Sequence, residues 1–355
     1  MSTTQQFEAA MERALELALL GPAVGVNPQV GAVILDANLN IVAEGWHLGA
    51  GTPHAEVAAL AKLGQVPAGA TAVVTLEPCN HTGKTGPCAQ ALIAAGISRV
   101  VYASSDPGQQ SAGGAQTLRE AGVEVIGGVL KERADQQLNV WLTATKQGRP
   151  FVTLKWASSL DGRAAANDGT SKWISGPESR TESHLRRSRV DAILVGTGTV
   201  LADDPELTAR QPDGSLYADQ PLRVILGERD LPADARIFDN QAPTLHLATR
   251  NIHGALADLF ARGVRHVWVE GGPDIASQFV RMNLVNQYLI YLAPKLLGGE
   301  RTALGGIGVA RMPEAKNLTI ESVTPLGPDL LIVANPQTPP TYPTQPIYPT
   351  QSSEA

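Results

Sequence analysis

The residue types best suited to metal chemistry gather in the first third of the chain. His54-Ala55-Glu56 follows a Gly-Thr-Pro turn, and the only two cysteines, Cys79 and Cys88, lie in one loop. One histidine and two thiolates are three of the four ligands of a tetrahedral zinc ion, which leaves a fourth position for water. An open position of this kind distinguishes catalytic zinc from structural zinc. We therefore expect His54, Cys79 and Cys88 to hold one Zn²⁺ per chain.

Glu56 lies two residues after His54 and is not needed as a ligand. In zinc enzymes that deaminate nucleobases, a metal-activated water attacks the ring carbon that carries the amine. A glutamate that is not a ligand moves protons to the ring nitrogen and to the leaving amine. We expect Glu56 to be this catalytic group.

The same residue types are also compatible with sites that do no chemistry. Cys79 and Cys88 could form a lone disulfide or be an inert buried pair, and a His-x-Glu sequence on its own is common. A structural site with four ligands would need His81 or His47 as the fourth. Such a closed site has no use for the free carboxylate of Glu56, so the combination favours catalysis.

The predicted elements place each ligand at the end of a strand or the start of a helix. His54 opens a predicted helix over 54–64, and Cys79 follows a predicted strand over 72–76. Cys88 opens a predicted helix over 88–95, with Pro87 in the first turn, where its missing N–H does no harm. The positive end of that helix favours a thiolate.

Strands and helices alternate along both halves of the chain, which predicts two α/β domains, the first of three layers. The first half begins with a predicted helix over 5–20 and a hairpin of strands 30–35 and 41–46, and ends with a predicted helix over 130–146. Gln147-Gly148-Arg149-Pro150 then breaks the pattern. We predict domains over 1–147 and 148–334, followed by a disordered tail over 335–355 that is rich in Pro, Thr, Gln and Tyr.

Composition excludes several classes of protein. Hydrophobic residues make up 43% and charged residues 17% of 355 residues, which is ordinary for a globular chain. The 28 Lys and Arg against 34 Asp and Glu give a net charge of −6, so no nucleic-acid partner is expected. No stretch is long and apolar enough for a membrane span, and two cysteines are too few for a disulfide scaffold. The apolar segment 7–20 is interrupted by Glu8, Glu12 and Glu16 and is not preceded by basic residues, so no signal peptide is expected. We expect a cytoplasmic protein that does not bind membranes.

Three motifs of the first half resemble the deaminase part of the bifunctional deaminase/reductase family of riboflavin biosynthesis. They are Asn27-Pro28-Gln29-Val30-Gly31, His54-Ala55-Glu56 and Thr75-Leu76-Glu77-Pro78-Cys79-Asn80-His81-Thr82-Gly83-Lys84-Thr85-Gly86-Pro87-Cys88. Nucleoside and tRNA deaminases usually have only two residues between the cysteines. The chain departs from the family at Asn80, where serine is usual, and at Gly86, where proline is usual.

The resemblance implies a cytidine-deaminase-like fold and a phosphorylated pyrimidine substrate. The reaction would be hydrolytic deamination of 2,5-diamino-6-(5-phosphoribosylamino)pyrimidin-4(3H)-one. The residues expected to bind this substrate are Asn27, His47, His81, Lys84 and Asp106. From pattern alone, His47 could equally be a capped strand end and Lys84 a solvated surface charge.

A Gly-Gly turn after a strand-like run is the main chemical feature of the second half. Gly271-Gly272 is followed by Pro273, and such a turn lets backbone N–H groups approach a phosphate at a helix start. Gly196-Thr197-Gly198 begins like a Rossmann fingerprint but lacks its third glycine. A dinucleotide site of another architecture is the better prediction.

Four further motifs resemble the reductase part of the same family, which has a dihydrofolate-reductase-like fold. They begin at Lys155, Ser171, Gly198 and Ala293, so the resemblance covers about residues 5–334. It implies that NADPH transfers a hydride to C1′ of the ring-opened ribosyl group, which becomes ribityl phosphate. The expected cofactor-binding residues are Ser158, Trp173, Thr199, Asp203, Gly272, Pro273, Asp274, Ile275, Ala276, Ser277 and Gln278. The expected substrate-binding residues are Ser171, Arg187, Leu207, Arg210 and Glu270.

Some roles in the second half stay open at this point. Arg187 and Arg210 suit bidentate phosphate binding, yet Arg187 could be a solvated helix end and Trp173 a core aromatic. Asp203 or water could donate the proton in the reduction. A zinc nucleoside or nucleic-acid deaminase with an unrelated second domain is the rival enzyme, and a binding protein with structural zinc is the rival from another class. We expect a homo-oligomer.

Overall fold

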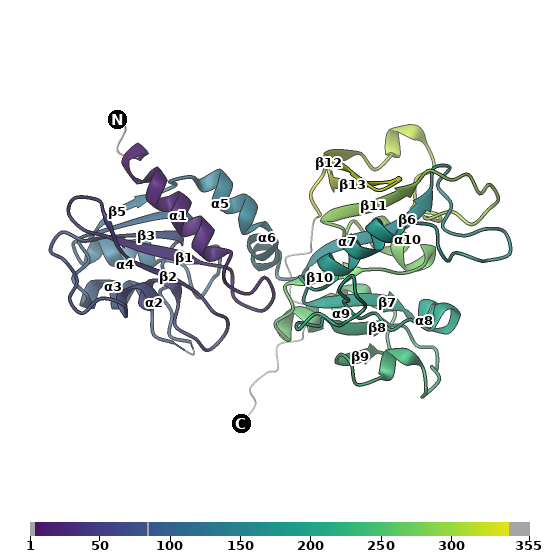
Figure 1. The fold of residues 1–355 in the computed structure, drawn as a ribbon, viewed down its shortest axis with the longest axis horizontal. Coiled ribbons are helices and arrows are strands. Elements are labelled where there is room, and N and C mark those ends of the chain that lie inside the picture. Colours follow the sequence, from purple (N-terminus) through teal and green to yellow (C-terminus); the bar gives the residue numbers. More distant parts are fainter. Residues whose placement is uncertain (1–3, 84, 341–355) are drawn as a thin grey trace, which may run out of the picture. The chain divides into compact units, whose positions relative to one another are not determined.

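The computed structural model describes residues 4–83 and 85–340 and divides the chain into two compact units, Met1–Lys146 and Gln147–Ala355 (Figure 1). The boundary predicted from the sequence lies one residue later, between residues 147 and 148. Lys84 and positions 341–355 of the predicted tail lie outside the described residues.

A five-stranded sheet in the order β2-β1-β3-β4-β5 forms the middle layer of the first unit. β1 (Gly31–Leu35) pairs antiparallel with β2 (Ile41–Trp46), which confirms the predicted hairpin, and also pairs antiparallel with β3 (Thr71–Leu76). β3, β4 (Arg99–Ser104) and β5 (Glu124–Gly127) are parallel. The carboxyl ends of β3 and β4 therefore meet at one edge, where the loop that carries Cys79 begins.

Helices cover both faces of this sheet, as Figure 1 shows. Alternate side chains of β1 explain why: Val33 and Leu35 point to one face, Ala32 and Ile34 to the other, and all four are buried. The first face packs against a 3-10 turn (Gln5–Phe7), α1 (Glu8–Ala18) and α5 (Lys131–Gln137). The second face packs against α2 (Ala55–Leu60), α3 (Cys88–Ala94) and α4 (Gly114–Glu120).

The helix predicted over 130–146 is two helices, α5 and α6 (Asn139–Gln147). Leu138, between them, is buried with Leu142 against Leu76 at the end of β3. The break thus lets the end of the helical segment pack against a different part of the sheet.

Two glycines allow the close approach of helices that positions the cysteine and histidine motifs. A Cβ added to Gly45 in β2 would lie 2.3 Å from the carbonyl oxygen of Ala55, at the start of α2. A Cβ added to Gly114 in α4 would lie 1.8 Å from the carbonyl oxygen of Pro78. Any side chain at these positions would push α2 away from the sheet or displace the loop before Cys79.

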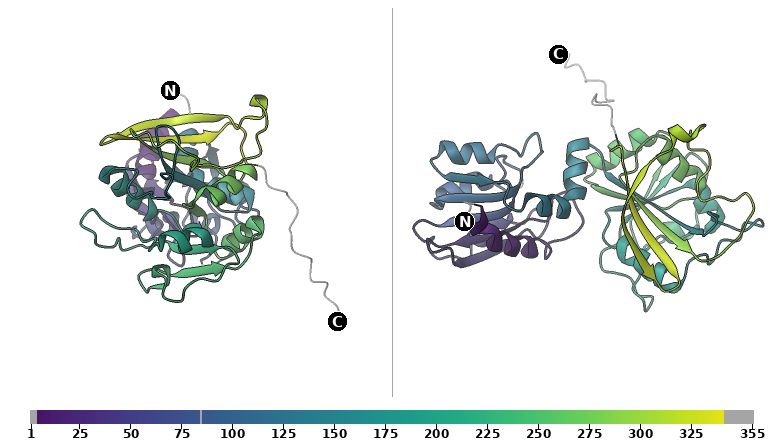
Figure 2. Two further views of the ribbon diagram at one scale, coloured as in Figure 1. Left: turned by 90° about the vertical axis from the view of Figure 1, so that its right-hand side faces the viewer. Right: turned by 90° about the horizontal axis from the view of Figure 1, so that it is seen from above.

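The second unit contains an eight-stranded sheet in the order β12-β13-β11-β6-β10-β7-β8-β9. The six strands from β11 to β9 are parallel, and the hairpin of β12 and β13 adds two antiparallel strands at one edge (Figure 2). The strands are β6 (Phe151–Ser159), β7 (Ala192–Gly196), β8 (Leu222–Leu226), β9 (Thr244–Leu247), β10 (His266–Val269), β11 (Gln287–Ala293), β12 (Leu318–Leu326) and β13 (Asp329–Pro336).

β12 and β13 form an antiparallel hairpin whose second strand extends into the predicted tail. Asn335 and Pro336, which the sequence analysis assigned to the disordered tail, pair with Thr319 and Leu318 of β12. Proline is tolerated here because it stands at the end of the strand.

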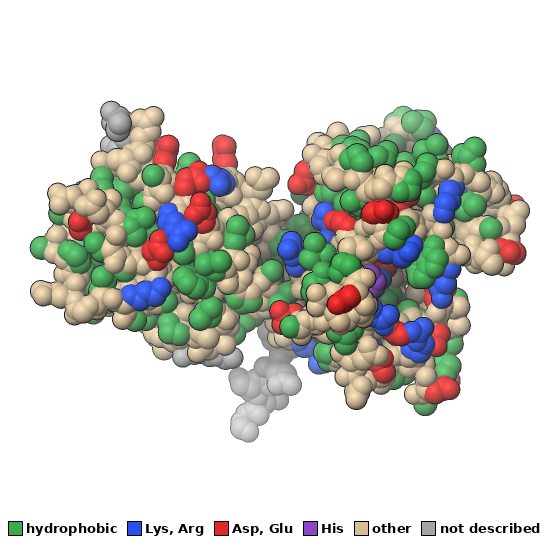
Figure 3. Space-filling view, in the orientation of Figure 1, with side chains coloured by type: hydrophobic (Ala, Val, Ile, Leu, Met, Phe, Trp, Pro, Cys, Tyr) green, Lys and Arg blue, Asp and Glu red, His purple; other side chains and the backbone are tan. Residues whose placement is uncertain are grey.

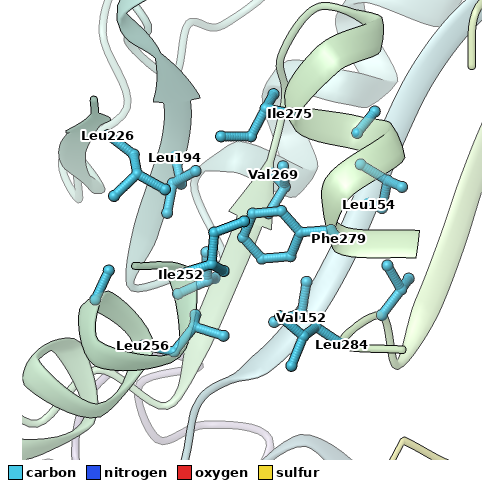
Figure 4. Close-up of a cluster of buried hydrophobic side chains, with 14 of the residues drawn as sticks. Val152, Leu154, Leu194, Leu226, Ile252, Leu256, Val269, Ile275, Phe279 and Leu284 are labelled. Carbon is cyan, nitrogen blue, oxygen red and sulfur yellow. The ribbon is translucent and has the colours of Figure 1, made fainter. Parts of the chain in front are cut away.

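Helices again cover both faces of the sheet. α9 (Ile252–Ala261) and α10 (Pro273–Arg281) bury Leu256 and Phe279 against Val152 and Leu154 of β6 (Figure 4). α7 (Pro177–Arg187) lies on the other face, where the hydroxyl of Ser179 donates to Asp329 over 2.6 Å. The remaining helical segments are α8 (Thr197–Asp203) and two 3-10 turns (Arg236–Phe238 and Met312–Glu314). Across residues 4–83 and 85–340, no helix has the length and apolar character needed to cross a membrane.

Candidate active sites

The three predicted metal ligands come together in the first unit. His54 Nδ1 lies 3.2 Å from Cys88 Sγ and 3.5 Å from Cys79 Sγ, and all three ligand atoms lie within 4.8 Å of one another. Zinc bonds of about 2.0–2.3 Å at tetrahedral angles place such atoms about 3.6 Å apart. The donor set therefore fits a zinc ion in both chemistry and spacing. His54 Nε2 lies 3.4 Å from Thr85 Oγ1, which suits a partner that orients the ring.

Each ligand lies next to an element boundary, as predicted. His54 is the extended residue that precedes α2, and Cys79 lies in the loop that follows β3. Cys88 is the first residue of α3, and its backbone N–H donates to Cys79 Sγ over 3.4 Å. Pro87 precedes the helix at the capping position and is not in the first turn.

The hydrogen bonds between the two thiols and His54 hold protons that a bound cation would displace. A hydrogen bond from Cys88 lowers the pKa of the Cys79 thiol to about 4, against the opposing effect of burial. The same hydrogen bond, together with burial, raises the pKa of the Cys88 thiol. The hydrogen bond to Cys79 raises the pKa of His54. Because a divalent cation replaces such shared protons when it binds thiolates, the cluster is a metal site by its chemistry.

Glu56 lies beside these ligands without belonging to them. Its side chain is buried in the first turn of α2 and hydrogen-bonds the Cys88 thiol. Burial raises the pKa of the Glu56 carboxyl above its ordinary value. A carboxyl group in this position can take up and release protons next to the metal site.

Asn27 and His47 continue the site beyond His54. His47 Nδ1 donates to the carbonyl oxygen of Pro53 over 3.1 Å, so its Nε2 is the acceptor for Asn27 Nδ2 at 2.9 Å. Burial lowers the pKa of His47, which keeps the ring neutral. The rings of His47 and His54 meet edge to face at 5.2 Å. Since both nitrogens of His47 are engaged, His47 is a poor candidate for a fourth metal ligand.

His81 lies within the loop between the two cysteines, and Asp106 lies after the neighbouring strand β4. Asp106 follows β4, is buried, and accepts a hydrogen bond from the Gly108 backbone over 2.8 Å; burial raises its pKa. His81 has a buried Nδ1 without a hydrogen-bond partner among the described residues, and it is not in the metal-ligand group. Lys84, the remaining predicted residue of this set, lies outside the described residues.

Glu77 is a residue of this site that the sequence analysis did not single out, although it stands in the quoted motif. Its carboxylate accepts from the backbone N–H groups of Asp106 over 3.4 Å and Ala115 over 3.1 Å. Glu77 thus ties the segment before Cys79 to the end of β4 and to α4. The sequence feature that could have identified Glu77 is its position directly after the apolar run of β3.

A cleft of about 1430 Å³ in the second unit holds most of the predicted cofactor and substrate residues. It lies where β6, β7, β8 and β10 end, which is the usual ligand site of parallel sheets. Figure 3 shows Lys and Arg side chains beside the hollow in this unit. The predicted residues that line the cleft are Ser171, Trp173, Arg187, Thr199, Asp203, Leu207, Arg210, Glu270, Gly272, Pro273, Asp274, Ile275 and Gln278.

Three predicted cofactor residues do not line this cleft. Ser158, Ala276 and Ser277 are buried within β6 and α10. The hydroxyl of Ser277 donates to the carbonyl oxygen of Pro273 and accepts from the backbone of Gly305. Successive side chains of a helix point in different directions, so Ala276 and Ser277 do not line the cleft that Ile275 and Gln278 line; their role in cofactor binding stays a prediction.

The Gly-Gly turn forms a narrow backbone cradle at the start of α10. Gly272 caps the helix, Pro273 is its first residue, and the Gly272 N–H donates to Thr199 Oγ1 over 3.2 Å. A Cβ added to Gly271 would lie 2.1 Å from Ile275 Cγ2. Only glycine fits, and its bare backbone at a helix start suits a dinucleotide phosphate.

A cluster of charges surrounds Glu270. Its carboxylate accepts from Lys155 Nζ at 2.8 Å, from Arg187 Nε and Nη2 at 3.0 and 2.8 Å, and from Trp268 Nε1 at 2.9 Å. Burial favours the neutral acid, but Arg187 and Lys155 outweigh it and hold the pKa of Glu270 well below its usual range. The Arg187 fork is thus occupied by a carboxylate and is not open for the phosphate that the sequence analysis expected. Lys155 was in a quoted motif but was not selected.

Two other predicted residues have surroundings that the sequence did not show. Arg210 contacts Glu206, which also contacts Arg236. Trp173 is 65% exposed and has the Arg180 guanidinium 4.6 Å from its ring centre, so it is not a core aromatic.

Comparison with known proteins decides the family. The model of the RibD C-terminal domain matches residues 150–332, and that of the cytidine and deoxycytidylate deaminase zinc-binding region matches residues 4–104. Riboflavin biosynthesis protein RibD of Mycobacterium tuberculosis is 50% identical over 306 residues, which cover 86% of this chain and 90% of that protein. The chain belongs to the RibD family.

Other RibD proteins agree over nearly the whole chain. The Escherichia coli RibD is 36% identical, covering 92% of this chain and 98% of its own. The structure of Acinetobacter baumannii RibD is 35% identical and superposes with a TM-score of 0.86, covering 94% of this chain and 100% of that one. A Thermotoga maritima structure, 34% identical with a TM-score of 0.83 and covering 94% of this chain and 99% of that one, is named as a diaminohydroxyphosphoribosylaminopyrimidine deaminase and 5-amino-6-(5-phosphoribosylamino)uracil reductase.

This RibD-family chain is therefore a bifunctional deaminase and reductase of riboflavin biosynthesis. The predicted folds are confirmed: a cytidine-deaminase-like first unit and a RibD reductase unit of the dihydrofolate-reductase-like type. The deaminase unit binds zinc, and the reductase unit is of the type that uses NADPH. The rival predictions of an unrelated second domain and of a binding protein are wrong, because the RibD reductase model matches 150–332.

We expect Cys79→Ser and Cys88→Ser each to lower the zinc content well below one ion per chain, because serine is a poor zinc ligand. His81→Ala should retain zinc, since His81 lies outside the ligand group. Metal analysis after dialysis against a weak chelator provides the measurement. Zinc loss in His81→Ala would instead indicate a closed site with four protein ligands.

We expect Glu270→Gln to destabilise the reductase unit by about 1–3 kcal/mol at pH 7, because it leaves the partly buried charges of Lys155 and Arg187 without their carboxylate partner. The pKa of Glu270 is lower in the folded state, so the difference from wild type should be constant above pH 5. It should shrink below about pH 4.3, where the unfolded chain takes up the proton. Denaturant unfolding across pH measures this, with exposed Glu300→Gln as the control. A difference that does not depend on pH would contradict the ion cluster.

Proposed function

We propose that this enzyme hydrolyses the amine from 2,5-diamino-6-(5-phosphoribosylamino)pyrimidin-4(3H)-one and then reduces the ribosyl group of the product to ribityl phosphate. The observation that carries the proposal is the presence in one chain of an open His/Cys/Cys set beside a spare glutamate and of a cleft with a dinucleotide cradle. The two activities named for the Thermotoga maritima relative support it.

For the deamination we propose that His54, Cys79 and Cys88 hold the metal and that Glu56 moves the protons. Zinc, when bound, lowers the pKa of water to about 7 and so supplies a nucleophile at neutral pH. Glu56 takes a proton from the attacking water and delivers it to the substrate, so that the C–N bond breaks and ammonia leaves. Its burial beside Cys88 keeps it close to the reacting atoms and away from solvent.

The pyrimidine-binding roles of the neighbouring residues are also proposals. Neutral His47 accepts from Asn27 Nδ2 next to His54 and so orients the Asn27 amide, whose oxygen we propose faces the pyrimidine ring. Asp106, after β4, and His81, within the cysteine loop, are further candidates. The Nδ1 of His81 has no hydrogen-bond partner among the described residues and offers one more polar contact. We assign Lys84 to the substrate phosphate on its charge alone.

For the reduction we propose that the cofactor lies along Thr199, Asp203 and the Gly271-Gly272 cradle, and that the substrate lies against Glu270. NADPH, when bound, supplies the hydride that C1′ accepts. The ring oxygen released at C1′ takes up a proton, for which we propose Asp203 or Lys155, both of which line the cleft. Arg187 and Lys155 keep Glu270 ionised. We propose that Arg210 binds the substrate phosphate in exchange for its contact with Glu206.

We further propose that the enzyme works in the cytoplasm as a homo-oligomer. Both cysteines are free thiols, which persist in a reducing compartment. The edge strand β12 exposes Ile320 and Val323, which a second copy could cover.

Incubation of the purified chain with the diaminopyrimidinone substrate tests both steps. We expect ammonia release without NADPH and, after NADPH is added, loss of its absorbance in proportion to product. The hydrolytic step needs no dinucleotide, so the order of events separates the two sites. Ammonia release that depends on NADPH, or no NADPH oxidation with the deaminated substrate, would refute the proposal.

We expect Glu56→Gln to retain zinc and to deaminate at least about a hundredfold more slowly, because glutamine cannot carry the proton. Reduction of the deaminated substrate should be unchanged in this variant, since Glu56 lies in the other unit. Ammonia release, NADPH oxidation and zinc content are measured on the same preparation. Near wild-type deamination would show that Glu56 is not the proton carrier.

A further inference from the structure

Among the described residues, two arginines of the reductase cleft, Arg180 and Arg229, have no carboxylate partner. Arg187 pairs with Glu270, Arg210 and Arg236 with Glu206, and Arg250 with Glu228 at 3.0 Å. Arg180 donates to the carbonyl oxygen of Ser175 and lies over Trp173. For Arg229, which also lines the cleft, the described part of the chain shows neither an ion pair nor a hydrogen-bond acceptor. An arginine with uncommitted donors in a ligand cleft is suited to bind an anion.

The position of the Arg229 guanidinium is set by a glycine. Arg229 follows β8, and its Nη2 atom would lie 2.9 Å from a Cβ added to Gly198, the second residue of α8. The guanidinium therefore lies over the Gly198 backbone. Thr199, the next residue, accepts from the Gly272 N–H. These contacts connect Gly272, Thr199, Gly198 and Arg229 into one continuous surface of the cleft.

The strand order gives the direction in which this surface runs, from β10 towards β8, and its approximate length. Glu270 follows β10, Gly196 ends β7, Arg229 follows β8, and these three strands are neighbours in that order. At about 4.8 Å between strands, β8, which Arg229 follows, lies about 10 Å along the sheet from β10, which Glu270 follows. A dinucleotide with its reactive ring near Glu270 and its pyrophosphate at the cradle would therefore extend its adenosine end towards Arg229.

We infer that Arg229 binds the phosphate on the adenosine ribose and so gives the cleft its preference for the phosphorylated dinucleotide. The planar fork of arginine matches a phosphate dianion, which the unphosphorylated dinucleotide lacks at this position. The acidic neighbours of Arg229 in the sequence do not neutralise it. Glu228 is paired with Arg250, and Asp230 forms no ion pair with Arg229 among the described residues. The inference rests on the proposed placement of the cofactor in this cleft.

Calorimetric titration of the full chain with NADP⁺ and NAD⁺ tests the inference through binding alone. Arg229→Gln should weaken NADP⁺ by about tenfold to a hundredfold, the range for lost hydrogen bonds between charged groups, and NAD⁺ by less than about twofold. Arg229→Lys, which keeps the charge but not the fork, should lose less. Arg262→Gln is the matched control, because Arg262 pairs with Asp258 on the exposed side of α9. Adenosine 2′-phosphate should follow NADP⁺, and adenosine 5′-phosphate should follow NAD⁺.

Two results would overturn the role of Arg229. An equal loss for both dinucleotides would place it at a group that they share, and no loss for either would place it outside the site. Failure of the wild-type chain to bind either dinucleotide would instead refute the assignment of the cleft. Unchanged melting temperatures of the variants separate all these results from misfolding, which is not expected because Arg229 is exposed.

Discussion

The carboxylate of Glu270 is only partly exposed, and it stays ionised because Arg187 and Lys155 contact it from two other elements. This pairing joins α7, β6 and the end of β10 at the floor of the reductase cleft. Removing any one partner leaves a partly buried charge without the group that compensates it. The metal centre of the first unit follows the same rule, since two buried thiols and a histidine share protons until a cation takes their place. In both units the proposed reaction site lies at a cluster of ionisable side chains that need a partner of opposite charge.

Close backbone packing holds these groups in position. Gly45 lets α2 lie on β2, which fixes the residue before that helix, His54. Gly114 lets α4 approach the loop that carries Cys79, and Glu77 ties the same loop to β4. The ligands thus come from elements that the sheet already orients, so little reorganisation is needed when the metal binds. The same principle applies to the bare backbone of Gly271, where a side chain would strike Ile275.

Much of this could be predicted from the sequence because the signals are local. The ligand types of His54, Cys79 and Cys88 were visible in their spacing, and the strands were visible in their apolar runs. α8 was not predicted, since Gly198 and its threonine neighbours are weak helix formers. Tertiary contacts of Thr199 with Gly272 and burial of Val200 hold it. The partner of Arg187, the burial of Ser158 and the pairing of Asn335 likewise depend on residues distant in the chain, which no local pattern shows.

The exposed indole of Trp173 has an optical consequence. Its ring faces the solvent-filled cleft under the Arg180 guanidinium, whereas Trp268 is buried with its Nε1 bound to Glu270. Emission from an indole shifts to shorter wavelength when water leaves its surroundings. The reductase cleft therefore contains its own fluorescent reporter, and a molecule that fills the cleft can be detected without a label.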